Sequence, residues 1–424
     1  RLGPGHARGV HGGIENGRGM ISPAKKGCDS MDNKIGLYLH IPFCMSKCAY
    51  CDFYSNAGES DYERFVNAMA LHMEDYAPSL RGREIDSVYI GGGTPTVLPT
   101  EQLTTLLDCV YENFSVSRSA EVSMECNPAT ADTSKLKKCR KAGVNRLSIG
   151  IQSASDAELH ELSRIHTWND AVACYNDARR AGFDNINLDI MYGIPLQTPD
   201  SLRDTLDAVT DLDPEHISLY CLKLEDGTPM ARNRHRLALP DDDTVADMYF
   251  DSIDLLASRG YDQYEISNFA REGYACRHNI RYWQPGEYLG LGPGAHSYLG
   301  SCRFSFRRDT ELYISAMEHP ERSYNIIDER YTIGQNDRIG EYVMLRLRTS
   351  YGIDLGEFRE LFGRDFDALY GSRLPQYEKG GYMKREDGRV FLTPEGMFVS
   401  SYILSDLLDF DGDIAEGEAS GKRA

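Results

Sequence analysis

Apolar residues follow two alternating patterns over the first half of the chain. Short β-rich runs predict strands at 36–41, 87–90, 121–125, 146–151, 186–191 and 216–224. Between them, apolar positions at helical spacing predict helices at 61–77, 101–114, 134–142, 170–181 and 200–209. Strands and helices that alternate about every thirty residues predict parallel strands joined by crossover helices. This pattern fits an open doubly wound sheet or a curved, incomplete barrel, and periodicity alone does not separate the two.

The pattern changes from about residue 329. Helical spacing recurs at 339–348 and 355–362, a hairpin is predicted at 382–392 with its turn at Asp387-Gly388, and a helix follows at 394–408. Helices with a hairpin are typical of a winged-helix-like module. We therefore expect an α/β core at 34–265, a connecting segment at 266–328 and a smaller, mostly helical domain at 329–410.

The two ends of the chain differ in composition from the rest. Residues 1–33 are rich in Gly, Arg and His, show no periodicity and lack the apolar stretch of a secretory signal. We expect a disordered extension or translated upstream sequence there, with the functional protein beginning near Met31. The acidic, Gly-rich residues 411–424 are predicted to be a disordered tail.

The net charge and the cysteine content restrict the kinds of binding partner and the cellular compartment that we expect for this protein. The chain has 424 residues, with 65 acidic and 46 basic side chains and a formal charge of −19. Such an acidic surface repels phosphate backbones, which argues against nucleic acid as a partner and favours a lid or docking role for the C-terminal module. No apolar stretch is long enough for stable membrane insertion. Eleven cysteines, most of them scattered singly through apolar runs, indicate a reducing compartment, and we expect the cytoplasm.

The most informative motif follows the first predicted strand. Cys44, Cys48 and Cys51 lie in a short run directly after Pro42. Iron–sulfur clusters are normally held by four thiolates, so three would leave one iron of a cubane cluster open to an outside ligand. The proline and the preceding strand disfavour three buried helical thiols. Zinc is disfavoured because no second ligand pair accompanies the motif, and disulfides because the cysteine number is odd.

Polar features follow the other predicted strands. Gly91-Gly92-Gly93-Thr94 follows the second strand, while Glu125, Gln152 and Asp189 lie at or just past the ends of later ones. Because chemistry collects at the carboxyl ends of parallel strands, we expect these features on one rim with the cysteine loop. Two carboxylates there favour binding of hydroxyl or ammonium groups. The structural alternatives are a flexible turn for the glycines, an ion pair for either carboxylate and a surface cation for Arg164.

Together these motifs resemble the radical S-adenosylmethionine (SAM) superfamily. The runs Tyr38-Leu39-His40-Ile41-Pro42-Phe43-Cys44 and Ile90-Gly91-Gly92-Gly93-Thr94-Pro95-Thr96 are similar to the oxygen-independent coproporphyrinogen III oxidase group, and the likeness extends over about residues 35–408. The resemblance implies a partial (β/α)6 barrel and a smaller helical domain.

The resemblance also implies the cofactors. Cys44, Cys48 and Cys51 would hold a [4Fe–4S] cluster, SAM would chelate the open iron, and an electron from the cluster would cleave SAM to a deoxyadenosyl radical. The implied SAM contacts are Tyr38, Tyr50, Gly92, Gly93, Thr94, Glu125, Gln152, Arg164 and Asp189.

Two branches of this group differ in their motifs. The oxidase resembles Cys-x-x-x-Cys-x-Phe-Cys-x-Cys, whereas here Tyr50 stands in place of the phenylalanine and Phe53 in place of the last cysteine. The oxidase also uses a structured segment ahead of the first strand, which we do not expect here. The run His278-Asn279-Ile280-Arg281-Tyr282-Trp283 is similar to a motif of the haem-chaperone branch. The resemblance is therefore closer to the haem chaperones.

Two histidines are candidates for haem contact. His278 precedes Tyr282 and Trp283, and an imidazole nitrogen can ligate iron while flat aromatic rings pack on a porphyrin. A buried, hydrogen-bonded histidine that supports a turn explains the same residue. His296, within the glycine-rich run 290–297, is the second candidate.

These resemblances predict a haem chaperone of porphyrin metabolism. It would carry a SAM-bound cluster and deliver haem to haem-accepting proteins, with respiratory membrane enzymes expected among them. The alternative is a radical SAM oxidase that decarboxylates coproporphyrinogen III, and a zinc-stabilised binding module is a minor third. The sequence leaves open the acceptor, the axial ligand of the haem iron and a homodimeric state.

Overall fold

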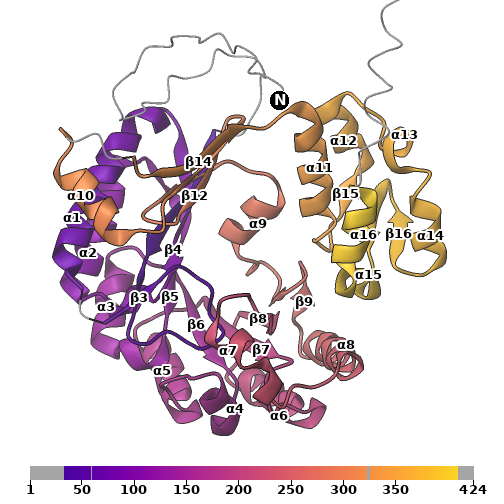
Figure 1. Ribbon diagram of the computed structural model, residues 1–424, viewed down its shortest axis with the longest axis horizontal. Coiled ribbons are helices and arrows are strands. Elements are labelled where there is room, and N and C mark those ends of the chain that lie inside the picture. The colour runs from indigo at the N-terminus through magenta and orange to yellow at the C-terminus, as the bar shows by residue number, and fades with distance from the viewer. Residues whose placement is uncertain (1–32, 59, 322–324, 409–424) are drawn as a thin grey trace, which may run out of the picture.

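The computed structural model describes residues 33–58, 60–321 and 325–408 (Figure 1). The predictions for residues 1–32 and 411–424 lie outside this part of the chain. Among the helices of the described part, none combines the length and apolar character that a membrane crossing needs.

Six parallel strands form the centre of the fold. They are β1 (Lys34–Ile41), β4 (Glu84–Gly92), β5 (Val116–Cys126), β6 (Arg146–Gln152), β7 (Ile186–Tyr192) and β8 (His216–Cys221), hydrogen-bonded in that order. The helices between them are α1 (Tyr62–Tyr76), α2 (Thr100–Asn113), α3 (Thr133–Lys141), α4 (Asp156–Glu161), α5 (Trp168–Arg180) and α6 (Pro199–Thr210). This order confirms the predicted parallel α/β architecture.

Short polar side chains begin these helices. At α1, α3, α4, α5 and α6 the residue before the helix accepts a hydrogen bond from a backbone N–H of the first turn. Such caps satisfy donors that the helix itself leaves unpaired, typically adding about 1 kcal/mol each. The local sequence thus fixes where these five helices start, whereas α2 follows Pro99 and has no side-chain cap.

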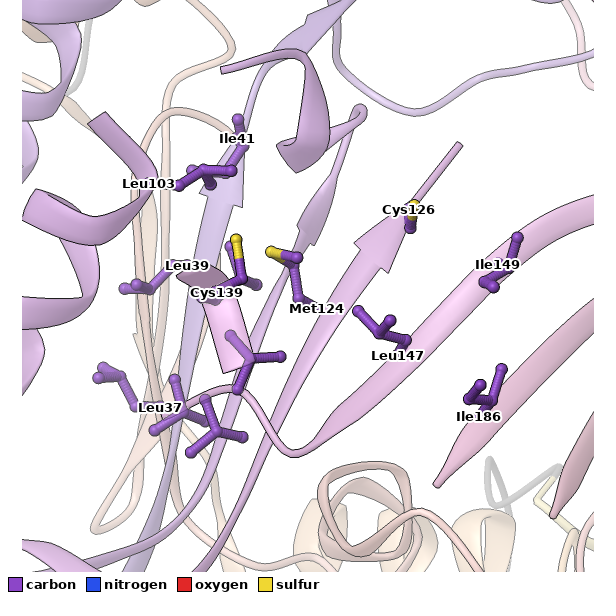
Figure 2. Close-up of a cluster of buried hydrophobic side chains, with 14 of the residues drawn as sticks. Leu37, Leu39, Ile41, Leu103, Met124, Cys126, Cys139, Leu147, Ile149 and Ile186 are labelled. Atoms are coloured by element: carbon purple, nitrogen blue, oxygen red, sulfur yellow. The ribbon is translucent and has the colours of Figure 1, made fainter. Parts of the chain in front are cut away.

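Along β1, successive side chains point alternately into the hydrophobic core and toward a cavity. Leu37, Leu39 and Ile41 are fully buried on the face toward the helices, where they belong to the hydrophobic cluster of Figure 2. Tyr38 and His40 alternate with them and line a cavity on the other face. Burying a side chain of leucine size contributes about 1.5–3 kcal/mol, so the aliphatic face anchors the strand that presents the polar one.

The connecting segment 266–328 extends the sheet, which the sequence pattern did not predict. On one side β11 (Tyr288–Leu291) pairs in parallel with β1, and β12 (His296–Leu299), β13 (Cys302–Phe306) and β14 (Ile327–Thr332) continue antiparallel. On the other side β10 (Asn268–Ala270) and β9 (Asp262–Gln263) follow β8. Helix α9 (Arg277–Trp283), which carries the His278 motif, lies between the barrel and the C-terminal domain (Figure 1). The remaining strands and α-helices ahead of the C-terminal domain are β2 (Phe43–Cys44), β3 (Asn56–Ala57), α7 (Pro229–Arg232), α8 (Asp242–Ser258) and α10 (Thr310–Glu318).

The C-terminal domain has a hydrophobic core of its own. Its elements are α11 (Gln335–Arg346), β15 (Ile353–Asp354), α12 (Leu355–Phe362), α13 (Phe366–Tyr370), α14 (Leu374–Lys379), β16 (Met383–Glu386), β17 (Arg389–Leu392), α15 (Pro394–Phe398) and α16 (Ser400–Leu407). The predicted hairpin is present, with positive φ angles of 48° at Asp387 and 75° at Gly388. We propose a domain boundary close to the predicted residue 329, at the end of β14, because β14 pairs with the barrel sheet and the two cores are separate.

The single helix predicted at 394–408 is wrong. Val399 has φ −101° and ψ 19°, which ends α15 before α16 begins. The preceding Phe398 packs on the rings of Tyr249 and Phe250 of α8. The chain therefore turns after this contact, so that Ile403 and Leu404 of α16 enter the C-terminal core.

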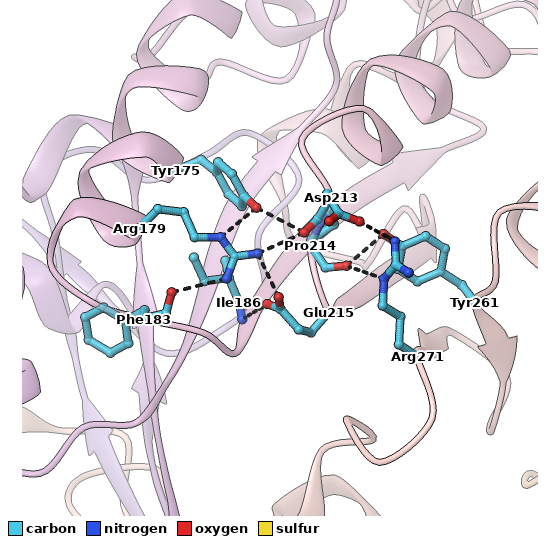
Figure 3. Close-up of polar contacts among 9 residues, drawn as sticks. All are labelled: Tyr175, Arg179, Phe183, Ile186, Asp213, Pro214, Glu215, Tyr261 and Arg271. Carbon is cyan, nitrogen blue, oxygen red and sulfur yellow. Dashed lines mark hydrogen bonds and ion pairs between the residues drawn. The ribbon is translucent and has the colours of Figure 1, made fainter.

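A polar clamp fixes the amino ends of β7 and β8 (Figure 3). Arg179 donates to the Glu215 carboxylate at 2.9 Å and to the Asp213 carbonyl at 2.9 Å, while Glu215 also accepts from the Ile186 N–H at 2.9 Å. Arg271 forms an ion pair with Asp213 from the other side. These contacts hold the strands at the end opposite to the rim where the predicted site residues lie.

Candidate functional site

One large cavity of about 920 Å³ lies at the carboxyl ends of the barrel strands. Its wall contains all three motif cysteines, Cys44, Cys48 and Cys51. It also contains every SAM contact implied by the sequence, namely Tyr38, Tyr50, Gly92, Gly93, Thr94, Glu125, Gln152, Arg164 and Asp189. Residues that lie far apart in the sequence therefore share one binding space.

The three cysteines lie on the loop that follows β1. All three are free thiols, half-buried against the cavity. Thr94 Oγ1 lies 3.6 Å from Cys44 Sγ, and Arg164 Nη1 lies 3.4 Å from Cys48 Sγ. The Arg164 guanidinium thus places a positive charge beside a sulfur that would carry negative charge as a metal ligand. Burial raises the pKa of the Cys51 thiol, which opposes ionisation until a ligand takes up the charge. Three free thiols on one loop fit the donor set of an iron–sulfur cluster with an open iron.

The triple glycine is required by close approaches. A Cβ at Gly91 would lie 2.7 Å from Glu125 Oε1, and one at Gly93 would lie 2.5 Å from the Phe43 carbonyl oxygen. At Gly92, φ is +109° and a Cβ would lie 2.5 Å from the His40 ring. The Gly93 N–H donates to the Ile41 carbonyl at 2.8 Å, which ties the segment to the strand that leads into the cysteine loop. The segment is thus a shaped part of the cavity and more than a flexible turn.

Two half-buried carboxyl groups face the same cavity. Glu125 accepts a hydrogen bond of 3.0 Å from the Gly92 N–H, and burial followed by the charge of Asp189 raises the pKa of Glu125 to about 7. Asp189 accepts from Asn187 at 2.7 Å and from Ser148 at 3.2 Å, and burial raises its pKa as well. Neither group has an ion-pair partner among the described residues. Both can therefore accept hydrogen bonds from ammonium or hydroxyl groups of a ligand.

Two residues with positive φ angles help to place the side chains of Gln152 and Arg164 in the cavity wall, and the sequence pattern did not predict these angles. Gln152 has φ +69° at the end of β6, and Ser163, directly before Arg164, has φ +58°. Such angles in non-glycine residues carry a penalty on the order of 1 kcal/mol and concentrate at functional sites. Arg164 is held by a 2.7 Å hydrogen bond to the Gly150 carbonyl. Its guanidinium therefore reaches the cysteine loop and is not a surface cation.

His278 does not line the cavity. Its Nδ1 lies 3.0 Å from Ser87 Oγ, its Nε2 lies 2.9 Å from Tyr282 Oη, and its ring stacks on Tyr89. Burial lowers its pKa to about 3. The position matches the alternative of a buried, supporting histidine. Haem contact at His278 stays a prediction, and in this structure iron ligation needs one of these two hydrogen bonds to be broken.

Another part of the cavity wall contains residues that the sequence did not predict as site residues, apart from His296 and Tyr282. Tyr282 of α9, Tyr288 of β11, Tyr298 of β12 and Arg303 of β13 line the cavity beside it. The signal available in the sequence was the density of aromatic and basic residues over 282–308. The sequence did not show that these residues share one surface, because the pairing of their strands was not predicted.

Comparisons with known proteins agree with this geometry. Residues 38–209 match the model of the radical SAM superfamily, and residues 333–399 match the HemN C-terminal domain. The chain is 34% identical over 375 residues to the haem chaperone HemW of Bacillus subtilis, which covers 88% of this chain and 98% of the relative. It is 35% identical over 373 residues to the haem chaperone HemW of Escherichia coli, covering 84% and 96%.

A solved structure is similar over most of the chain. Coproporphyrinogen III oxidase (HemN) of Escherichia coli, described as a radical SAM enzyme, matches with a TM-score of 0.79 and 25% identity. The match covers 89% of this chain and 90% of that one. The fold is therefore the radical SAM partial barrel with a smaller C-terminal domain.

Proposed function

Because the chain belongs to the radical SAM superfamily and, within it, to the HemW family of haem chaperones, we propose that it binds haem and delivers it to haem-accepting proteins. The proposal includes a [4Fe–4S] cluster on Cys44, Cys48 and Cys51, with SAM at the open iron. When bound, these groups would supply one-electron cleavage of SAM. The observation that supports this most is that the three thiols and all the proposed SAM contacts line one cavity.

The side chains have distinct proposed roles. Glu125 and Asp189 accept hydrogen bonds from amino and hydroxyl groups of SAM, since both are half-buried acceptors that line the cavity and are held by neighbouring polar groups. Arg164 supplies positive charge beside Cys48, and the backbone at Gly92 and Gly93 allows the ligand close approach. Respiratory membrane enzymes are the proposed acceptors.

The second candidate is coproporphyrinogen III oxidase, which the similarity to HemN of Escherichia coli favours. Against it, Phe53 occupies the position of the oxidase's further cysteine, and its side chain is 69% exposed. A phenylalanine there supplies no thiol near the cluster loop. The chaperone therefore remains the leading proposal.

One anaerobic experiment separates the two functions. The cluster is reconstituted, haemin is titrated while the Soret band is followed, and the loaded protein is mixed with haem-depleted respiratory membranes. The same preparation is then assayed for conversion of coproporphyrinogen III with SAM and a reductant. Haem binding and transfer without conversion supports the chaperone, whereas protoporphyrinogen formation supports the oxidase. Recovery of zinc without iron would contradict both.

A further inference from the structure

A second wall of the cavity holds none of the proposed cluster or SAM contacts. It is formed by Tyr288 on β11, His296 and Tyr298 on β12, and Arg303 on β13. Tyr288 pairs with Tyr298, and Tyr298 pairs with Arg303, across neighbouring antiparallel strands. Directly opposed residues share a face, and so do His296 and Tyr298, two apart on one strand. The register therefore places an imidazole, two phenol rings and a guanidinium side by side.

His296 marks the end of this wall nearest to the cysteine loop. β11 runs parallel to β1, so its carboxyl end lies at the edge from which the cysteine loop starts. His296 begins β12 directly after the turn at 292–295. An added Cβ at Gly294 in this turn would lie 3.5 Å from Tyr54 Cβ, three residues beyond Cys51. The imidazole thus belongs to the rim that carries the cysteines.

His296 is also the uncommitted imidazole of the cavity. The only other histidine in the described lining is His40, whose Nδ1 lies 3.0 Å from Tyr38 Oη and whose Nε2 lies 2.9 Å from the Tyr54 carbonyl oxygen. The exposed ring of His296 has no hydrogen bond or ion pair with any residue that the structure describes. Partial burial and then the charge of Arg308 lower its pKa, which favours the neutral ring that ligates metal.

Two arginines differ in their availability on this side of the cavity. Arg303 donates at 3.0 Å from both Nε and Nη2 to the Glu341 carboxylate of α11, and it lies over the Tyr298 ring at 4.6 Å. Arg308 also lines the cavity, is exposed, and has no ion pair within the described chain. In a chain of charge −19, an unpaired guanidinium in a cavity is suited to a carboxylate ligand.

We propose that haem docks on this second wall, with His296 as a ligand of its iron, the Tyr288 ring against the porphyrin and Arg308 paired with a propionate. Tyr298 is only 4% exposed and lies under Arg303, so it supports the wall from behind. The inference rests on the proposed haem-chaperone function and names the residues that hold the cargo. A neutral imidazole suits the iron, a flat aromatic ring suits the porphyrin and a guanidinium suits a carboxylate. The proposed SAM contacts lie on other parts of the lining, namely the barrel strands and the loops that follow them, so this wall is not used by the proposed SAM site.

The iron ligand is tested on the reconstituted full chain by haemin titration with absorption and electron paramagnetic resonance spectra. His296→Ala is expected to shift the Soret band, change the spin state of the iron and weaken haem binding at least about tenfold. Added imidazole is expected to restore the wild-type spectrum, which a purely structural defect would not allow. His160→Ala, an exposed histidine of α4 outside the cavity lining, is the matched control with an unchanged spectrum.

The outcomes separate the inference from the function on which it rests. A wild-type spectrum in His296→Ala overturns the inference and leaves the chaperone proposal intact. A thiolate-type signal that disappears in Cys221→Ser has the same consequence, since Cys221 lines the cavity from the end of β8, which is separated from β12 by six strands of the sheet. Absence of haem binding in the wild-type protein overturns the chaperone proposal itself. The spectral change in His296→Ala supports haem ligation by His296 only if the variant keeps the iron content and the SAM binding of the wild type.

The propionate contact has its own test. Arg308→Gln is expected to weaken binding of haem about tenfold but to leave binding of haem dimethyl ester unchanged, because the ester has no carboxylate to pair. Arg307→Gln, at an exposed neighbouring arginine outside the cavity lining, is the control and should bind both ligands as the wild type does. Equal losses for haem and its ester in Arg308→Gln would overturn the assignment.

Discussion

Tyr282 Oη lies 2.9 Å from His278 Nε2, and this hydrogen bond joins the cavity wall to the buried motif behind it. The second ring nitrogen of His278 is used by Ser87 at 3.0 Å. The histidine of the motif therefore positions the tyrosine that faces the cavity. This relationship explains how the motif can influence a ligand that it does not touch.

Replacement of His278 by alanine is expected to weaken the fold and to leave the iron ligand in place. The change removes two hydrogen bonds and the stacking on Tyr89, which together stabilise by about 2–4 kcal/mol. The free energy of unfolding from urea titration measures the loss, and the Soret position of haem-loaded protein should stay unchanged. A stable variant with an altered haem spectrum would instead make His278 an iron ligand.

Replacement of Cys44, Cys48 or Cys51 by serine is expected to abolish the cluster. Iron in the anaerobically reconstituted protein should fall from about four atoms per chain to background, because the remaining thiols cannot hold the cubane. Cys109→Ser is the matched control, since Cys109 is a half-buried thiol of α2 outside the cavity lining. Retention of about four iron atoms in a motif variant would refute the assignment.

Binding of SAM is expected to depend on pH through Glu125, whose pKa is raised to about 7. The ligand prefers the carboxylate, so binding below pH 7 must displace a proton and affinity should fall by up to about tenfold per pH unit. The folding stability of the ligand-free protein depends on pH in the opposite direction. Because the pKa of Glu125 is raised in the folded state, the group contributes stability below pH 4.5, and this contribution is lost as the pH rises through about 7.

Calorimetry in buffers of different ionisation enthalpy measures the proton displaced on binding of SAM. Glu125→Gln should bind more weakly at pH 8 and show less pH dependence. Glu101→Gln, at an exposed glutamate of α2, should behave as the wild type. An unchanged pH profile in Glu125→Gln would exclude Glu125 as the titrating group.

Arg179→Ala is expected to destabilise the barrel by about 2 kcal/mol without changing SAM or haem binding. The clamp that it breaks lies at the amino ends of β7 and β8, away from the cavity. Arg203→Ala is the control, because its ion pair with Asp251 is 3.6 Å long and both side chains are more than half exposed. Equal losses in the two variants would show that the clamp adds nothing beyond a surface pair.

Local patterns predicted the barrel well because its elements are long and regular. The strand at 36–41 and the helix at 61–77 appear as β1 (Lys34–Ile41) and α1 (Tyr62–Tyr76). The turn at Asp387-Gly388 was predictable because few residues adopt two successive positive φ angles. The break at Val399 was not, because it depends on the packing of Phe398 against a helix from the other domain.

The motif histidine illustrates a second limit of the sequence. An imidazole beside two aromatic residues has the same pattern whether it contacts a ligand or supports a wall. Only the positions of Ser87 and Tyr282 around His278 show that both ring nitrogens are already used. The sequence likewise named His296 as a candidate without showing that its ring is free and faces the cavity.

The sequence by itself determined the order of the six barrel strands and the longer helices between them, the three-thiol loop and the polar residues at strand ends, because these depend on short-range spacing and side-chain chemistry. The tertiary structure decided which of these residues share a cavity and which histidine is accessible within it. It also made strands of 288–291 and 296–299, which are too short to be predicted alone and gain their hydrogen bonds from β1 and from one another. Contacts between distant segments set burial and pairing, and those are the properties that local sequence does not encode.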